Sequence, residues 1–196
     1  MNVPNILTLS RMGLAGVLMA LLAISFPFSK SLALIVFVVA GITDYLDGYL
    51  ARNVYGVTSF GRLMDPLADK VMVCAAFVAF VELQLVPAWI VVIIISREFL
   101  VTGLRLLAAS RGQIMSAGKW GKHKTVWQII AISVLLLGLA VQHDLLTDAS
   151  TQFMADYQLG FKMIAFGVGV AAALITVASG VMYFTENQEL LSRHFS

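Results

Sequence analysis

The sequence predicts an all-α integral membrane protein, built as a bundle of six transmembrane helices. Hydrophobic residues make up 60% of the 196 residues and charged residues only 12%, whereas charged residues make up roughly 25% of an average soluble domain. Apolar runs follow one another along the chain, and they lack the alternating pattern of roughly ten residues that a membrane barrel needs. No linker or internal repeat divides the sequence, so we expect a single domain over residues 1–196.

The six expected helices are joined by short connections. The first, 7–28, is long for a signal-peptide core and is followed at once by further apolar segments, so we interpret it as a retained membrane helix. The second, 32–52, has 21 residues, or about 31 Å of helix, which matches a hydrocarbon core of about 30 Å. The last four are apolar runs with embedded polar residues, at 61–82, 86–109, 125–143 and 159–184.

The charges of the connecting segments orient the bundle. The segment 110–124 carries four basic residues, whereas 142–160 carries three acidic residues and no Lys or Arg. The positive-inside rule therefore places 110–124 in the cytoplasm. Counting helices puts 53–60 and both termini on the same side, with Lys30 as a single positive exception outside. We expect a multi-pass protein of the cytoplasmic (inner) membrane whose polar site faces the cytoplasm.

Four aspartates and several small residues bridge the second and third expected helices. Their pattern is Asp44-x2-Asp47-Gly48-x2-Ala51-Arg52-x8-Gly61-x3-Asp65-x3-Asp69. A carboxylate deep in a bilayer costs at least ~2.5 kcal/mol unless something compensates it. The first two aspartates lie on the same helix face as Gly48 and Ala51, and these small side chains leave room there for a large ligand. The last two aspartates share a face of the next helix. We expect the four carboxylates to form one cage.

Oxygen ligands of this kind suit hard divalent cations such as Mg²⁺ or Mn²⁺. Two ions would bring the cage near neutrality and stabilise the attacking and leaving oxygens of a phosphoryl transfer. A helix cap at Asp65-Pro66, or ion pairs with Arg52, Arg62 and Lys70, would explain single acids but not the spacing with glycines. A cation transporter is a further alternative, although the acids crowd near one surface and the sequence shows no repeated halves.

A second polar cluster carries positive charge in the segments 97–105 and 121–125. We expect a phosphorylated acceptor to be held there by Arg105, Lys122 and Lys124. The positive-inside rule alone is the alternative explanation for basic residues in this region. The net charge of +2 is small, and the basic residues are clustered rather than spread as a stripe, so nucleic acid is not an expected partner.

The aspartate pattern resembles the signature of the CDP-alcohol phosphatidyltransferase family and matches it at every position. The resemblance implies six transmembrane helices, a homodimer, and two divalent cations, Mg²⁺ or Mn²⁺. The implied metal ligands are Asp44, Asp47, Asp65 and Asp69, and the implied CDP-binding residues are Gly48, Ala51, Arg52 and Gly61. It further implies that Asp69 deprotonates the acceptor alcohol.

In the basic cluster and in the opening segment 4–11, the chain is similar to family members that use glycerol 3-phosphate. This implies transfer of a phosphatidyl group from CDP-diacylglycerol to glycerol 3-phosphate, with release of CMP, on the route to phosphatidylglycerol and cardiolipin. Inositol phosphate, serine and phosphatidylglycerol are the alternative acceptors, because the aspartate motif recognises the donor and does not specify the acceptor. Asn5, Thr8 and Arg11 either border the nucleotide or headgroup region or belong to an amphipathic entry segment.

Overall fold

The computed structural model describes residues 3–50, 59–110, 119–146 and 150–188, with side chains described over 9–44, 70–109, 121, 123–146 and 150–188. These residues form helices and no strands, as the sequence predicts. The helices are α1 (Val3–Ala23), α2 (Ser29–Leu50), α3 (Ser59–Glu82), α4 (Ala88–Ser110), α5 (Lys119–Ala140) and α6 (Thr151–Glu186). A π-helical turn, η2 (Val141–Leu145), extends α5.

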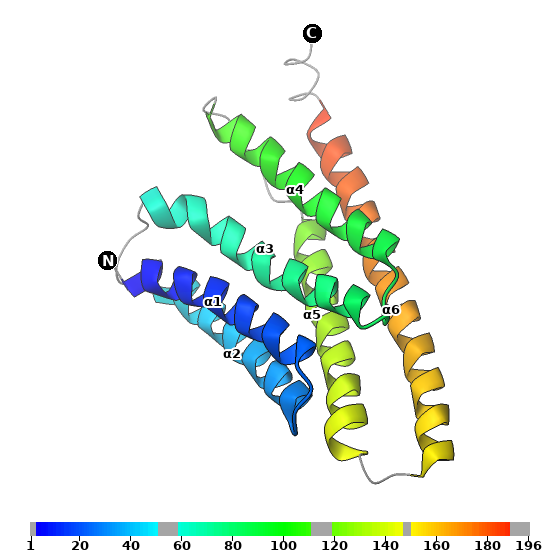
Figure 1. The fold of residues 1–196 in the computed structure, drawn as a ribbon. Helices are drawn as coiled ribbons and strands as arrows, with labels where there is room; N and C mark the ends of the chain where they lie inside the picture. The colour runs from blue at the N-terminus through cyan, green and yellow to red at the C-terminus, as the bar shows by residue number, and fades with distance from the viewer. Residues whose placement is uncertain (1–2, 51–58, 111–118, 147–149, 189–196) are drawn as a thin grey trace.

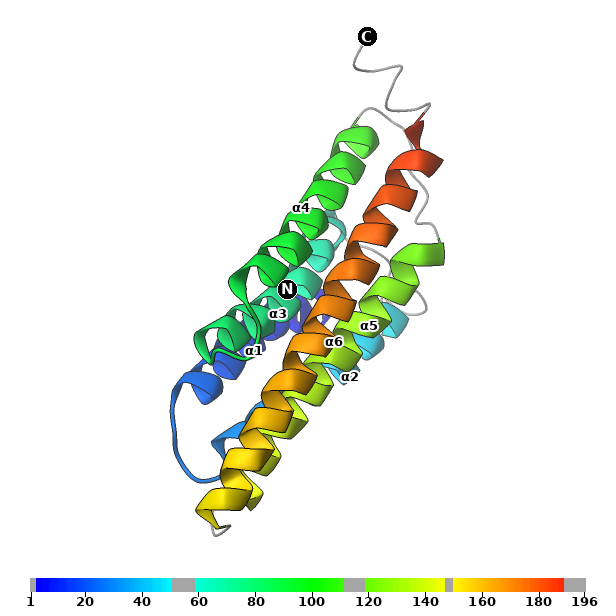
Figure 2. The same ribbon diagram turned by 90° about the vertical axis from the view of Figure 1, so that its right-hand side faces the viewer.

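Successive helices run in opposite directions through the bundle. Helix α1 packs against both α2 and α3, α5 packs against α2 and α6, and α6 also packs against α4. The starts of α1, α3 and α5 therefore lie at the same end as the ends of α2, α4 and α6, toward the left and top of Figure 1. The quarter-turn view in Figure 2 shows α6 running alongside both α4 and α5. The acidic and basic motifs are thus carried by helix segments at one end of the molecule.

The buried core is apolar and is centred on α3. Phe77 and Phe80 are fully buried, and their rings meet edge to face with centroids 6.3 Å apart. Leu18 of α1 and Leu135 of α5 are buried in the same cluster. Within a membrane, close packing of this kind is a main force between helices, because lipid tails are as apolar as the side chains.

Large apolar side chains also cover the outside of the bundle. Ile35, Val92, Met163 and Leu174 are more than half exposed, and an exposed apolar surface of this extent is typical of membrane contact. Two helical stretches of the described residues are long and apolar enough to cross a membrane, His123–Leu145 and Thr151–Glu186. These features fit a membrane protein, and the expectation of six complete spans stays a prediction.

The boundary between the first two helices differs from the predicted one. Helix α1 ends at Ala23, not at 28, and Phe28 adopts a left-handed backbone conformation with φ 64° before α2 begins at Ser29. Lys30 is only 2% exposed. Its amine donates to the carbonyls of Leu21, Leu22 and Ile24 at 3.2, 2.5 and 3.2 Å. Lys30 therefore caps the end of α1, which gives a structural reason for the positive charge at this end.

The polar segment 142–160, predicted to be a loop, is largely helical. The backbone amide of Phe153 donates to the side chain of Ser150 at 3.4 Å, which caps the start of α6 at Thr151, eight residues before the predicted start. The hydroxyl of Tyr157 then donates to the carbonyl of Gly138 at 3.0 Å. The loop prediction was wrong because polar residues of this segment have partners within the bundle: Tyr157 bonds to α5, and the carboxylate of Asp144 accepts from the backbone amide and hydroxyl of Ser31 at 2.7 and 2.6 Å.

Candidate active site

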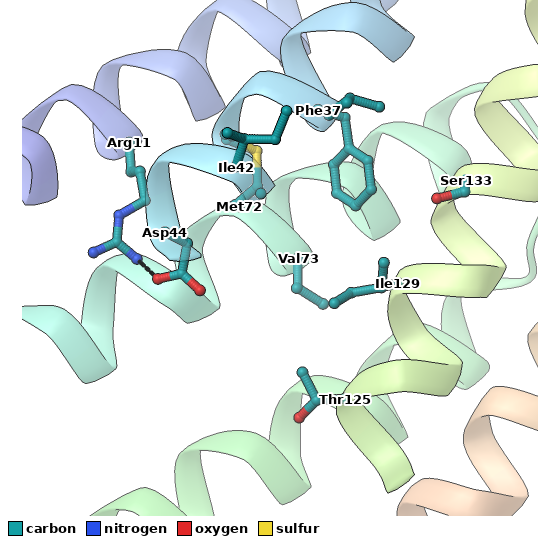
Figure 3. A pocket seen from close by; sticks show the side chains of 12 residues that line it. Arg11, Phe37, Ile42, Asp44, Met72, Val73, Thr125, Ile129 and Ser133 are labelled. Carbon is teal, nitrogen blue, oxygen red and sulfur yellow. Dashed lines mark hydrogen bonds and ion pairs between the residues drawn. The ribbon is translucent and has the colours of Figure 1, made fainter. Parts of the chain in front are cut away.

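Asp44 lies near the end of α2 and faces a cavity of about 480 Å³ between α1, α2, α3 and α5. Its side chain is 54% exposed, and its carboxylate accepts a hydrogen bond from the guanidinium of Arg11 on α1, which is 4% exposed. Figure 3 shows this ion pair at one side of the cavity. The pair places a compensated but accessible carboxylate in the bundle, as the energetic argument from the sequence requires.

The rest of the cavity is mostly apolar. Phe37 and Gly41 of α2, Val73 of α3 and Ile129 of α5 line it, and the hydroxyl-bearing Thr125 lies on the α5 side. Gly41 leaves open space where a Cβ would stand. An apolar cavity with a few charged groups at one side suits a ligand that has a hydrophobic part and a charged part.

The other residues of the acidic motif are placed only by their backbones or lie outside the described residues. Asp47 and Gly48 follow Asp44 within one further turn of α2, and Gly61, Asp65 and Asp69 occupy the first turns of α3. Both helices pack on α1. Ala51 and Arg52 lie outside the described residues, as do the side chains of Asp47, Asp65 and Asp69. The four-carboxylate cage therefore stays a prediction.

Asp44 itself suits a hard divalent cation. It supplies carboxylate oxygens, it is open to the cavity, and its helix brings a second aspartate within one turn. Among the residues with described side chains, no three potential ligands lie close enough to form a complete metal site. The donor chemistry at Asp44 fits the expected Mg²⁺ or Mn²⁺, with the remaining ligands expected from the other aspartates of the motif.

The basic residues form a second buried cluster between α4, α5 and α6. The amine of Lys124 donates to the carboxylate of Glu98, and both residues are buried. The guanidinium of Arg97 lies 3.5 Å from the same carboxylate oxygen and donates to the hydroxyl of Ser179 at 2.8 Å. A Cβ added to Gly180 would lie 3.3 Å from Cγ of Arg97, so the glycine makes room for this side chain.

Arg105 also belongs to the cluster and lies about two helical turns after Arg97 on α4. Its guanidinium lies 5.3 Å from the centre of the Tyr183 ring, within the range of a cation–π contact. The Nε atoms of Arg97 and Arg105 are buried, and no described group accepts a hydrogen bond from them. Lys124 and Arg97 share the carboxylate of Glu98, whereas Arg105 faces the Tyr183 ring. Among the described side chains of this cluster, three cations thus accompany one carboxylate, and this imbalance suits an anionic ligand.

The predicted acceptor residues have different outcomes. Arg105 and Lys124 both lie in the basic cluster, Arg105 partly buried and Lys124 buried, but Lys124 faces Glu98 rather than the Asp44 cavity. The side chain of Lys122 lies outside the described residues. Sequence reasoning did not place Arg97 in the site, although a charged Arg97-Glu98 pair inside an apolar run is a signal of a functional position.

The two clusters meet at the start of α5. Lys124 points to α4, whereas its neighbour Thr125 lines the Asp44 cavity. Successive helix residues are turned by about 100°, so one turn of α5 contributes to both regions. The Asp44 cavity and the basic cluster are thus adjacent, on two sides of the same helix.

A model of the CDP-alcohol phosphatidyltransferase family matches residues 1–178, which include every residue of both clusters except those in the last turns of α6. The chain belongs to the CDP-alcohol phosphatidyltransferase family. The Asp44 cavity and the aspartates on α2 and α3 are therefore the region where this phosphatidyltransferase carries its family signature. The resemblance noted in the sequence is confirmed.

Three similar proteins share one name. A protein of Bacillus subtilis (strain 168) called CDP-diacylglycerol–glycerol-3-phosphate 3-phosphatidyltransferase is 40% identical, over 97% of this chain and 97% of its own length. A protein of the same name from Rickettsia bellii is 32% identical over 93% of each chain. Another, from Haemophilus influenzae, is 40% identical over 69% of this phosphatidyltransferase and 75% of its own length.

Proposed function

We propose that the protein transfers the phosphatidyl group of CDP-diacylglycerol to glycerol 3-phosphate, giving phosphatidylglycerophosphate and CMP. The observation that carries this proposal is the near full-length similarity to relatives named for that reaction. The amphipathic cavity at Asp44 supports it, because a liponucleotide combines acyl chains with a charged diphosphate. The net positive cluster on α4 and α5 supports a phosphorylated acceptor.

For the donor, we propose that Asp44, Asp47, Asp65 and Asp69 hold two divalent cations, Mg²⁺ or Mn²⁺. When bound, these ions supply positive charge that stabilises the transferring phosphoryl group and the departing CMP phosphate. The nucleotide lies against Gly48, Ala51 and Gly61, and Arg52 helps to neutralise the diphosphate. The apolar wall of the cavity excludes water from the reacting phosphorus, which favours transfer over hydrolysis.

For the acceptor, Arg105, Lys122 and Lys124 hold the phosphate of glycerol 3-phosphate. Asp69 takes the proton from the 1-hydroxyl, and that oxygen attacks the phosphorus that bears the diacylglycerol. The bond from this phosphorus to the bridging oxygen breaks, and CMP leaves with that oxygen. Fixing the acceptor by its phosphate converts an encounter into an oriented attack, which is a large part of catalysis by proximity.

The location and assembly follow from the same features. We propose that the protein lies in the cytoplasmic membrane with both termini and both clusters toward the cytoplasm, where glycerol 3-phosphate is dissolved. The basic residues at the start of α5 support this orientation. A homodimer is proposed from the family resemblance.

An acceptor panel tests the reaction. Purified protein in detergent is given CDP-diacylglycerol with glycerol 3-phosphate, inositol phosphate, serine or water, with and without a chelator, and CMP release is measured. We expect release with glycerol 3-phosphate only, lost with chelator and restored by Mg²⁺ or Mn²⁺. Release with another acceptor would assign a sister activity, and no release with any acceptor would favour the transporter alternative.

The proposed base has a direct test. Asp69→Asn cannot accept the proton and also weakens a metal ligand, so we expect turnover to fall by at least about 10²-fold, the lower end for loss of a general base. The rate of CMP release at saturating substrates measures the effect. Normal turnover in this variant would remove Asp69 from the mechanism.

A further inference from the structure

The opening segment of the chain contributes Arg11 to the Asp44 cavity, and the proposed reaction gives this residue no role. Arg11 lies on α1, 33 residues before its partner Asp44 on α2. Its guanidinium donates to Oδ1 of Asp44, and both residues line the cavity. The amphipathic-segment interpretation of Arg11 is therefore insufficient, because its side chain points into the bundle.

The two partners differ sharply in burial. Arg11 is nearly fully buried, whereas the carboxylate of Asp44 is half exposed to the cavity. Arg11 thus approaches Asp44 from the protein side and leaves the carboxylate open on the cavity side (Figure 3). A carboxylate has about four lone-pair positions, so an arginine on one oxygen leaves room for a cation on the other.

We propose that Arg11 is a positioning residue that fixes the Asp44 carboxylate for a divalent cation. Partners behind a metal ligand hold its orientation, and their loss typically weakens metal binding by 10–100-fold. The guanidinium is well placed for this role, because it is buried within the bundle and donates directly to Oδ1 of Asp44. This inference rests on the proposed metal-dependent function.

The test measures binding of Mn²⁺ alone, in detergent and without substrate, from the electron paramagnetic resonance signal of the free ion. We expect Arg11→Gln to weaken Mn²⁺ binding by about 10–100-fold. Arg11→Lys keeps the charge but loses the planar fork, so we expect a smaller weakening of several-fold. Lys162→Gln is the control, since it removes a positive charge from an exposed position on α6 that does not line the Asp44 cavity, and its Mn²⁺ affinity should equal that of the unmodified protein.

The outcomes separate the two levels of the proposal. If the unmodified protein binds no Mn²⁺, the metal-dependent function and the role of Arg11 fail together. If it binds Mn²⁺ and both Arg11 variants bind it equally well or more tightly, only the positioning role is overturned, and tighter binding would identify Arg11 as a competitor of the metal. Should Arg11→Gln not fold, Arg11→Lys decides alone, because unchanged affinity in that variant contradicts the proposal.

Discussion

Glu98 is the residue on which the basic cluster depends. It faces Lys124 and Arg97 from α5 and α4, and all three side chains are largely buried. Removing one partner of a buried ion pair leaves an uncompensated charge, which costs far more than the pair contributes when it is complete. Glu98 therefore has a larger structural role than its absence from the predicted site residues suggests.

We expect Glu98→Gln to lower the free energy of unfolding by about 3–5 kcal/mol, the range for breaking a buried pair. Thermal unfolding of the purified protein in detergent measures the change. Lys162→Gln is the control, because Lys162 is exposed on α6 and a surface substitution there should change stability by less than about 0.5 kcal/mol. Equal effects of the two substitutions would show that the Glu98 cluster contributes no special stability.

The acceptor assignment is also decided by single residues. We expect Lys122→Gln and Lys124→Gln to raise the KM for glycerol 3-phosphate by roughly 10–100-fold, since a hydrogen bond to a charged group contributes about 1.5–3 kcal/mol. The KM for CDP-diacylglycerol should change much less. Steady-state kinetics with each substrate varied in turn gives both values, and similar increases for the two substrates would contradict the assignment.

At the scale of the helices, α5 and α6 approach each other closely at Gly138, where an added Cβ would meet a neighbour at a shorter distance than at any other described glycine. A Cβ added to Gly138 would lie 2.0 Å from the Phe161 ring. The Tyr157 ring stacks on Phe161 with centroids 6.0 Å apart, and its hydroxyl binds the Gly138 carbonyl. Small residues at such contacts let membrane helices approach closely, and here the ring of α6 occupies the space above Gly138.

Gly138→Ala should therefore destabilise the protein by about 1–3 kcal/mol, because the ring has to move. Gly160→Ala is the matched control: it lies in α6 with nothing within 4 Å of its added Cβ, so the helix should gain up to about 1 kcal/mol. Thermal unfolding in detergent compares the two. A neutral Gly138→Ala would show that Phe161 relaxes without cost.

Helix number and helix ends were not equally predictable from the sequence. The apolar runs indicate six helices because each must satisfy its own backbone in a membrane, and the described residues form α1 to α6. The ends depend on side chains used as caps, such as Lys30 on the carbonyls of α1 and Ser150 at the start of α6. Polarity alone assigns such residues to loops.

At the scale of the whole molecule, the gathering of both motifs at one end followed from counting helices. The sequence assigned the compensation of Asp44 to bound cations, which stays a prediction, and it did not indicate the pairing with Arg11, 33 residues away. Likewise, the pairing of Lys124 with Glu98 depends on how α4 and α5 are rotated, which periodicity does not determine. Sequence patterns locate polar clusters, whereas partners across helices require the fold.

The orientation of the bundle can be measured in cells. In a Cys74→Ser background, Ser150→Cys marks the start of α6 and Gln188→Cys its far end, and both positions are exposed. With the proposed orientation, a membrane-impermeant thiol reagent labels Ser150→Cys in intact cells, and Gln188→Cys only after permeabilisation. The reverse pattern would place the active site outside.

The first turn of α5 with described side chains carries Lys124 on one side and Thr125 on the other. Rotating this turn by a few degrees shifts the wall of the Asp44 cavity and the Lys124–Glu98 pair at once. Apparent affinities for the lipid donor and the soluble acceptor are therefore coupled in any variant that displaces the backbone of this turn, unlike Lys124→Gln, which only removes an amine. A compound wedged beside the turn would inhibit the use of both.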